Sequence, residues 1–205
     1  MTQTRERTDG MERFRRELAE FIDNLYESER KVLVFGEGRI GAPVMMIGEA
    51  PGEQESLLGR PFVGKAGKNL DAFLEEAEMD RSALYVTNTV KFRPTKLSAA
   101  GRTVNRPPTQ EEVRLFLPWL LKEIELVDPR YIITLGNVPL KALTGRGSVI
   151  GDMHGRFIDW QGRRLFAMYH PASVIYNPGL KAVYSRDIVA FACQYREETE
   201  KEHGM

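Results

Sequence analysis

Cysteine is nearly missing from this sequence: Cys193 is the single one among 205 residues. One thiol excludes an internal disulfide framework, and it excludes a zinc or iron–sulfur site made only of cysteines from one chain. An apolar run long enough to span a membrane and a secretory leader pattern are missing as well. We therefore expect a cytoplasmic protein with no membrane partner and no bound metal.

Net charge is missing too. Lysine and arginine together number 29, and so do aspartate and glutamate. This balance gives no sign of a nucleic-acid partner, so any basic surface must be local. The length and the 42% hydrophobic content suit one globular domain over residues 1–205. We expect its polar first segment, 1–10, to be disordered and the protein to be a monomer.

Apolar segments of strand length alternate with segments of helical periodicity. Strands are expected at 44–47, 82–88, 131–135 and 165–169. Helices are expected at 11–29, from 64–67 onward, at 109–127, at 139–144 and at 180–200, with a small hairpin within 145–162. Thr109 and Glu112 have the spacing of a capping box at one helix start. The alternation predicts an α/β fold in which a parallel sheet has helices on both faces.

Three of the four expected strands end in a residue that can do chemistry, namely Glu49, Asn88 and His170. The carboxyl ends of parallel strands share one edge of a sheet, so these side chains can converge although they are far apart in sequence. Each also has an ordinary structural interpretation, as a solvated turn carboxylate, a turn former and a core histidine. Their common position favours a functional site.

A glycine-rich loop, 59–66, nearly matches the phosphate-binding pattern G-x-x-x-x-G-K-[ST]. Its last residue is Ala66, where the pattern needs a hydroxyl for magnesium, so a nucleotide-binding protein is a disfavoured alternative to a glycine-rich helix start. The loop also holds Phe62 between Pro61 and Val63. A rigid, exposed aromatic there is suited to stacking on a planar ring.

The stretch 89–108 is expected to be irregular, and it contains five basic residues and no acidic one. Such a loop is either simply solvated or, next to a site, placed to contact the phosphates of a nucleic acid. The candidate DNA contacts in it are Lys91, Arg93, Arg102 and Arg106.

Four motifs occur in order along the chain: Gly48-Glu-Ala-Pro-Gly52, Gly59-Arg-Pro-Phe-Val-Gly-Lys-Ala-Gly67, Asn88-Thr-Val-Lys-Phe-Arg-Pro94 and His170-Pro-Ala-Ser173. Together they resemble the uracil-DNA glycosylase superfamily, most closely its family 4 enzymes, over about 35–191. The resemblance implies a three-layer α/β/α sandwich with a central four-stranded parallel sheet. It also implies a pocket that takes a uracil flipped out of DNA.

The resemblance assigns roles by position. The residues implied to bind uracil are Gly48, Glu49, Ala50, Phe62, Asn88 and His170. Phe62 would stack on the base, the Asn88 amide would pair with its polar edge and reject cytosine, and His170 would donate to O2 as negative charge develops there. The segment 170–178, with Ser173 as a DNA contact, would lie near the minor groove.

The catalytic carboxylate is a point of departure from related enzymes. Family 1 relatives have an aspartate at the position of Ala50, so here the group that steadies the sugar cation and orients water must come from elsewhere. We favour Glu49, with Glu55 second, acting together with His170.

The cofactor is a second departure. Family 4 enzymes hold a [4Fe–4S] cluster on four cysteines, but here Phe92 and Phe116 occupy two of the expected positions, and the amino-terminal pair is missing from 24–30. We therefore expect no cluster, and we expect both phenylalanines to fill its place as an apolar plug beside the first helix.

The expected function is excision of uracil from DNA by a monofunctional hydrolase of N-glycosidic bonds, in base excision repair. A related branch traps the abasic sugar with a histidine in an insertion comparable to 95–104, but 89–108 contains no histidine, so turnover is expected. Two alternatives stay open: another deaminated base such as hypoxanthine or xanthine, and a weakly active relative that binds DNA or an inhibitor.

Overall fold

The apolar strand segments form the centre of a mixed sheet. The computed structural model describes residues 2–27 and 29–203. Its parallel strands, in spatial order, are β3 (Tyr85–Asn88), β2 (Val44–Gly48), β6 (Tyr131–Leu135) and β8 (Arg163–Met168). Two short antiparallel strands, β1 (Glu37–Gly38) and β7 (Phe157–Trp160), extend the sheet beside β3 and β8. The predicted four-stranded parallel sheet is confirmed as the centre of a six-stranded one.

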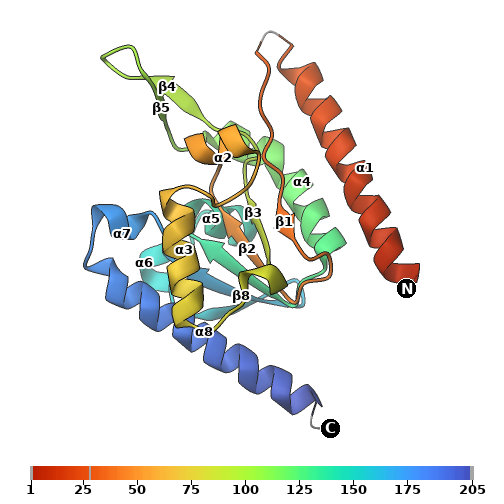
Figure 1. Cartoon of the computed structure of the whole chain (residues 1–205), viewed down its shortest axis with the longest axis vertical. Helices are drawn as coiled ribbons and strands as arrows, with labels where there is room; N and C mark the ends of the chain where they lie inside the picture. The colour runs from red at the N-terminus through yellow and green to blue at the C-terminus, as the bar shows by residue number, and fades with distance from the viewer. Residues whose placement is uncertain (1, 28, 204–205) are drawn as a thin grey trace.

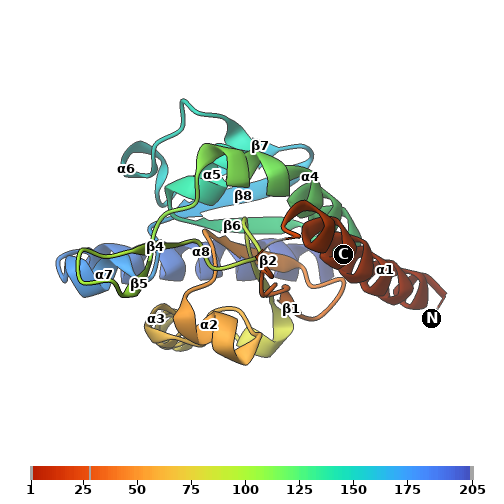
Figure 2. The same ribbon diagram turned by 90° about the horizontal axis from the view of Figure 1, so that it is seen from above.

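Helices cover both faces of this sheet (Figure 1, Figure 2). On one face, α3 (Lys65–Glu76) and α8 (Leu180–His203) pack over Val44, Met46 and Ile133. On the other face, α1 (Thr2–Leu25) and α4 (Gln110–Val127) pack over Met45, Ile47 and Ile132. Successive residues of one strand thus enter different cores, as the period of two in a β-strand requires. The three-layer α/β/α arrangement is confirmed.

The first helix differs from its prediction at both ends. It begins at Thr2, so the segment 2–10 is helical and not disordered. An ion pair between Arg7 and Asp128, at 2.7 Å, ties this polar turn to the end of α4. The helix ends at Leu25, short of the predicted 29. Parts of these predictions, at Met1 and Ser28, lie outside the described residues.

Helix α4 begins as the capping box predicts. The Thr109 hydroxyl accepts a hydrogen bond from the Glu112 N–H at 3.1 Å, and the Glu112 carboxylate accepts one from the Thr109 N–H at 2.7 Å. Two donors exposed at the helix start are thereby satisfied. Helix α5 (Asn137–Thr144) and the start of α8 at Leu180 also lie where the sequence predicts them.

The connections are more regular than expected. Within 89–108, β4 (Thr95–Leu97) and β5 (Thr103–Asn105) pair as an antiparallel hairpin that extends away from the sheet (Figure 1). The hairpin expected within 145–162 instead joins β7 to β8. Short helical turns add to the loops: α2 (Glu53–Leu58), η1 (Arg81–Ala83), α6 (Ile150–Met153) and α7 (Ser173–Tyr176). Of the helices within 2–27 and 29–203, none combines the length and apolar character that a membrane crossing requires.

Candidate active site

The ends of β2 and β3 are bonded to each other. Gly48 and Asn88 are direct neighbours in the parallel register. Beyond them, the N–H and the hydroxyl of Thr89 both donate to the Gly48 carbonyl at 2.9 Å, and the Val90 N–H donates to the Glu49 carbonyl at 3.0 Å. The turn after β2 and the turn after β3 therefore form one rigid edge, and Glu49 and Asn88 come together as predicted.

Gly48 is the point where three parts of the site meet. A Cβ atom built on Gly48 would overlap Oδ1 of Asn88 and would lie 2.5 Å from Cζ of Phe62. Only a residue without a side chain lets the amide and the aromatic ring approach the strand end together. The Asn88 side chain is buried, and it forms no hydrogen bond with another described residue. Its amide is therefore available to a ligand at this edge.

Phe62 faces inward. It is 5% exposed, which corrects the expectation of an exposed aromatic, because its ring packs between Gly48 and the ring of His170. The rings of Phe62 and His170 are tilted by 30° with their centroids 6.0 Å apart. Phe62 also has a left-handed backbone conformation, with φ of 53°, which is uncommon for a bulky residue. The loop thus holds the ring at the sheet edge in a conformation that needs support from its neighbours.

His170 follows β8 and is held as a neutral imidazole. The Ala172 N–H donates to Nδ1 at 3.1 Å, so Nδ1 is an acceptor and the ring proton resides on Nε2. Burial lowers the pKa of His170 from 6.5 to about 4, although the negative charge of Glu55 acts in the opposite direction. At neutral pH this residue can donate a hydrogen bond through Nε2 without carrying a charge.

Glu49 and Glu55 have different surroundings. Burial raises the pKa of the Glu49 carboxyl, and this side chain forms no hydrogen bond or ion pair with the rest of the described chain. Glu55, by contrast, accepts hydrogen bonds from the N–H groups of Gly52, Val63 and Gly64, at 3.1, 3.0 and 2.7 Å. Its oxygens are therefore engaged in fixing the loop, which makes Glu49 the better candidate for chemistry.

The basic residues expected to contact DNA divide into two groups. Lys91 is fully buried, so its prediction as a surface contact is wrong: Nζ bonds Glu123 at 2.5 Å and the Asn88 carbonyl at 2.6 Å. Arg106 is engaged by both oxygens of Glu112, each at 2.7 Å. These two side chains serve the structure and do not face a ligand.

The remaining contacts differ in exposure: Arg102 is exposed, whereas Arg93 and Ser173 are half-buried. Arg102 is exposed on the β4–β5 hairpin, and Arg93 reaches Asn105 at 2.6 Å and Glu53 at 3.2 Å. Ser173 begins α7, where its N–H donates to the His170 carbonyl at 2.8 Å. Ala50 packs against the core on the α1 and α4 face, which places its backbone but no functional group beside the site.

Comparison with known proteins shows which family the chain belongs to. Residues 35–192 match the family model described as the uracil DNA glycosylase superfamily. The chain belongs to the uracil-DNA glycosylase superfamily.

Two relatives in this superfamily are named type-4 uracil-DNA glycosylase. The one from Pyrobaculum aerophilum is 39% identical over 172 residues, which cover 79% of this chain and 83% of the relative. The one from Thermotoga maritima is 36% identical over 150 residues, covering 72% and 74%. The crystal structure of SMUG2 from Pedobacter heparinus aligns with a TM-score of 0.53 at 12% identity, over 78% of this chain and 76% of that one. The last comparison supports the fold.

An iron–sulfur cluster of the family 4 kind does not fit these residues. The one cysteine, Cys193, lies exposed on α8. Phe92 and Phe116 pack edge to face with ring centroids 5.5 Å apart, and Tyr26 packs on Phe92 at 5.6 Å. Among the residues that the structure describes, no three His, Cys, Asp or Glu side chains are grouped to hold a metal. A cluster that needs four thiolates has no ligand set here.

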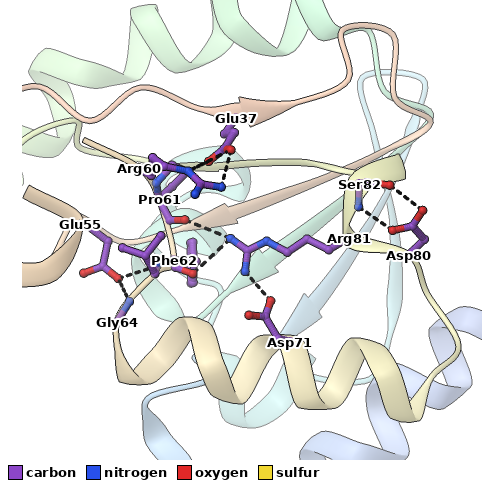
Figure 3. Close-up of polar contacts among 11 residues, drawn as sticks. Glu37, Glu55, Arg60, Pro61, Phe62, Gly64, Asp71, Asp80, Arg81 and Ser82 are labelled. Carbon is purple, nitrogen blue, oxygen red and sulfur yellow. Dashed lines mark hydrogen bonds and ion pairs between the residues drawn. The ribbon is translucent and has the colours of Figure 1, made fainter. Parts of the chain in front are cut away.

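Two residues that support the candidate site were not found from the sequence. Glu123 lies on the inward face of α4, at helical spacing from Phe116 and Leu120, and this periodicity was a usable signal for a buried acid. Arg81 reaches the carbonyls of Pro61 and Phe62 from η1 (Figure 3). No local sequence pattern predicts this contact, because it joins residues about twenty positions apart in the chain.

Proposed function

We propose that the chain is a monofunctional uracil-DNA glycosylase that flips uracil out of DNA, hydrolyses its N-glycosidic bond and uses no metal or iron–sulfur cofactor. One observation carries the proposal: a buried, unengaged amide and an aromatic ring meet at Gly48, and a neutral imidazole lies beside that ring at the sheet edge. The superfamily membership and the relatives named type-4 uracil-DNA glycosylase support it. The substrate is uracil-containing DNA, and the reaction would serve base excision repair in the cytoplasm.

Recognition follows from hydrogen-bonding capacity. Uracil presents a carbonyl acceptor at O4 and a donor at N3–H, and a carboxamide offers the complementary N–H and C=O. A buried amide in a fixed orientation rejects cytosine, whose donor and acceptor are exchanged, because the mismatch leaves buried polar groups unpaired. The Asn88 main chain is fixed, since its carbonyl accepts a hydrogen bond from buried Lys91 at 2.6 Å. Phe62 supplies the flat surface for the flipped base.

Catalysis requires stabilisation of two opposite charges. When the bond between N1 and C1′ breaks, its electron pair leaves with uracil and the sugar becomes an oxocarbenium-like cation. The Nε2–H of His170 donates to O2 of uracil, and one preorganised donor of this kind lowers such a barrier by about 3 kcal/mol. The Glu49 carboxylate opposes the sugar cation and orients the water that adds to C1′. Because the His170 ring is uncharged, it adds no positive charge next to the sugar cation.

DNA contacts surround this edge. Helix α7, which begins three residues after His170, exposes Ile175 by 44% and Tyr176 by 86%. Apolar side chains of this size are suited to fill the space that a flipped base leaves in the stack. Arg102 on the hairpin, Arg93 and the start of α7 at Ser173 are candidates for phosphate contacts.

The decisive experiment measures base release from single-stranded and double-stranded oligonucleotides that carry one uracil. The wild-type chain should release uracil with multiple turnovers and without a denaturation-resistant adduct. Asn88→Ala and His170→Ala should each lower the rate by about a hundredfold or more while DNA affinity changes little. Matched oligonucleotides with hypoxanthine, xanthine or cytosine complete the panel. An intact uracil strand, or faster release of another base, would contradict the proposal.

A further inference from the structure

The backbone at Phe62 is strained, and the strain lies in the residue that stacks on the base. Its φ of 53° places a bulky aromatic residue in the left-handed region, where the surroundings must compensate the conformational cost. The Phe62 carbonyl also packs directly against Gly67, because a Cβ atom there would overlap it. The loop therefore does not hold this conformation by its own preference.

Two ionisable side chains hold this loop from opposite sides (Figure 3). Glu55 accepts from the N–H groups of Val63 and Gly64, the two residues after Phe62. Arg81 donates from Nη2 to the carbonyls of Pro61 at 3.0 Å and of Phe62 at 3.1 Å. The carbonyls of Pro61 and Phe62 and the next two N–H groups are thus bonded to charged side chains, and charge-assisted hydrogen bonds are the stronger kind.

Arg81 is itself anchored. Its Nη1 pairs with Asp71 on α3, the helix that the loop enters. On the other side, the Asp80 carboxylate caps η1 by accepting from the N–H and the hydroxyl of Ser82, at 2.8 and 2.6 Å. Strand β3 begins one residue beyond η1 and ends at Asn88. One short segment therefore carries the anchor of the stacking ring at its beginning and the base-reading amide at its end.

We propose that Arg81 is a positioning residue that fixes the Phe62 ring for stacking on the flipped uracil; the inference rests on the proposed function. Arg81 contacts the main chain and not the base. Its loss therefore releases the carbonyls of Pro61 and Phe62, and the ring no longer stays at the distance from Asn88 that uracil needs.

The test is a double-mutant cycle between Arg81→Met and Phe62→Ala, read as the single-turnover rate of uracil release from a single-stranded oligonucleotide. Arg81→Met should lower this rate about tenfold, the range expected when a stacking contact is impaired, and should change the Kd for DNA little. In the Phe62→Ala background the same substitution should change the rate by less than about twofold, because there is no ring to position. Arg81→Lys, which keeps a charged donor, should restore part of the rate.

Two variants serve as matched controls. Arg196→Met removes an arginine that also donates to a main-chain carbonyl, that of Ala77 at 3.1 Å, at the other end of α3. Arg60→Met removes the ion pair with Glu37 from the same loop without touching the carbonyl of Phe62. Both should release uracil at the wild-type rate.

The outcomes separate the two claims. Equal losses from Arg81→Met in both backgrounds, or no loss in the wild-type background, would overturn the positioning role while uracil release by the wild type upholds the proposed function. A wild-type chain that releases no uracil would overturn the proposed function and the inference with it.

Discussion

At the scale of single residues, Glu49 and His170 have pKa values that burial moves in opposite senses. Burial raises the pKa of the Glu49 carboxyl and lowers that of His170 to about 4. The proposed mechanism needs an ionised carboxylate and a neutral imidazole. Glu49 is ionised only above its raised pKa, whereas His170 stays neutral at every pH above about 4. The acid limb of the pH profile is therefore set by Glu49.

The prediction is that single-turnover uracil release falls as the pH drops through a pKa above the ordinary carboxyl value of 4.5. Glu49→Gln should remove this limb and lower the plateau rate by about a hundredfold. Rates from pH 4.5 to pH 9 on one buffer series provide the measurement, with Glu111→Gln, on the exposed start of α4, as control. An unchanged limb in Glu49→Gln would assign the titration to another group.

Gly48 provides a second residue-level prediction. A methyl group there would overlap the Asn88 amide and press on the Phe62 ring, so Gly48→Ala should displace both groups that hold the base. Displacements of about 1 Å in a site lower rates by about a hundredfold, and we expect that loss in kcat/KM. Gly147→Ala is the matched control, because a Cβ there meets nothing within 4 Å. Wild-type activity in Gly48→Ala would show that the site has more room than this packing allows.

The sequence located Glu49, Asn88 and His170 at one edge of the sheet, because the carboxyl ends of parallel strands lie at the same edge. The prediction failed at Lys91, because a lysine in a basic loop was expected to be exposed. The distinction depends on Glu123, which lies 32 positions away and bonds the ammonium at 2.5 Å. A contact of that separation leaves no trace in local composition.

At the scale of elements, β3 and α4 are joined by this buried ion pair. The Lys91 ammonium donates to Thr87 at 2.7 Å as well, and the Tyr85 hydroxyl donates to Glu123 at 3.0 Å. Burial lowers the pKa of Lys91, and the adjacent carboxylate of Glu123 opposes that shift. The pair connects the helix to the strand end that carries Asn88.

Removal of one partner should be costly. Lys91→Met leaves the Glu123 carboxylate buried without its cation, and we expect a loss of about 3–5 kcal/mol in the free energy of unfolding, measured by urea denaturation. The double variant Lys91→Met with Glu123→Leu replaces the pair by apolar side chains and should recover most of that loss. If Lys91→Met unfolds at the same urea concentration as the wild type, the ion pair does not stabilise this junction.

Element boundaries could be predicted where local chemistry sets them and not elsewhere. The start of α4 was found because Thr109 and Glu112 satisfy the helix N–H groups locally. The β4–β5 hairpin was missed because its strands have three residues each and are largely exposed, so they lack the alternation that marks a half-buried strand. The two strands pair only with each other, and they contain no core residue whose position would indicate the register of the pairing.

At the scale of the whole molecule, an aromatic group connects α1 to the sheet and to α4. Phe92 is 2% exposed and Phe116 is 0% exposed, and Tyr26 joins them just beyond α1. The Lys31 ammonium lies above the rings of Tyr26 and Phe92, at 5.0 and 5.2 Å from their centroids. Cation–π contacts of this kind add to the packing energy of the group. Dispersion and burial thus join the amino-terminal helix to the domain.

The last prediction concerns this aromatic group, which under our proposal stands where related enzymes bind their cluster. Purified protein should contain iron far below one equivalent and show no visible absorbance from sulfide-to-iron bands, and a chelator should leave its Tm unchanged. Phe92→Ala and Phe116→Ala should each lower the free energy of unfolding by about 3–5 kcal/mol, as loss of a buried ring does. Phe21→Ala, on a residue 38% exposed on α1, should cost much less. Stoichiometric iron would contradict the proposal, because the one thiol of this chain, Cys193, lies exposed on α8 and cannot supply four ligands.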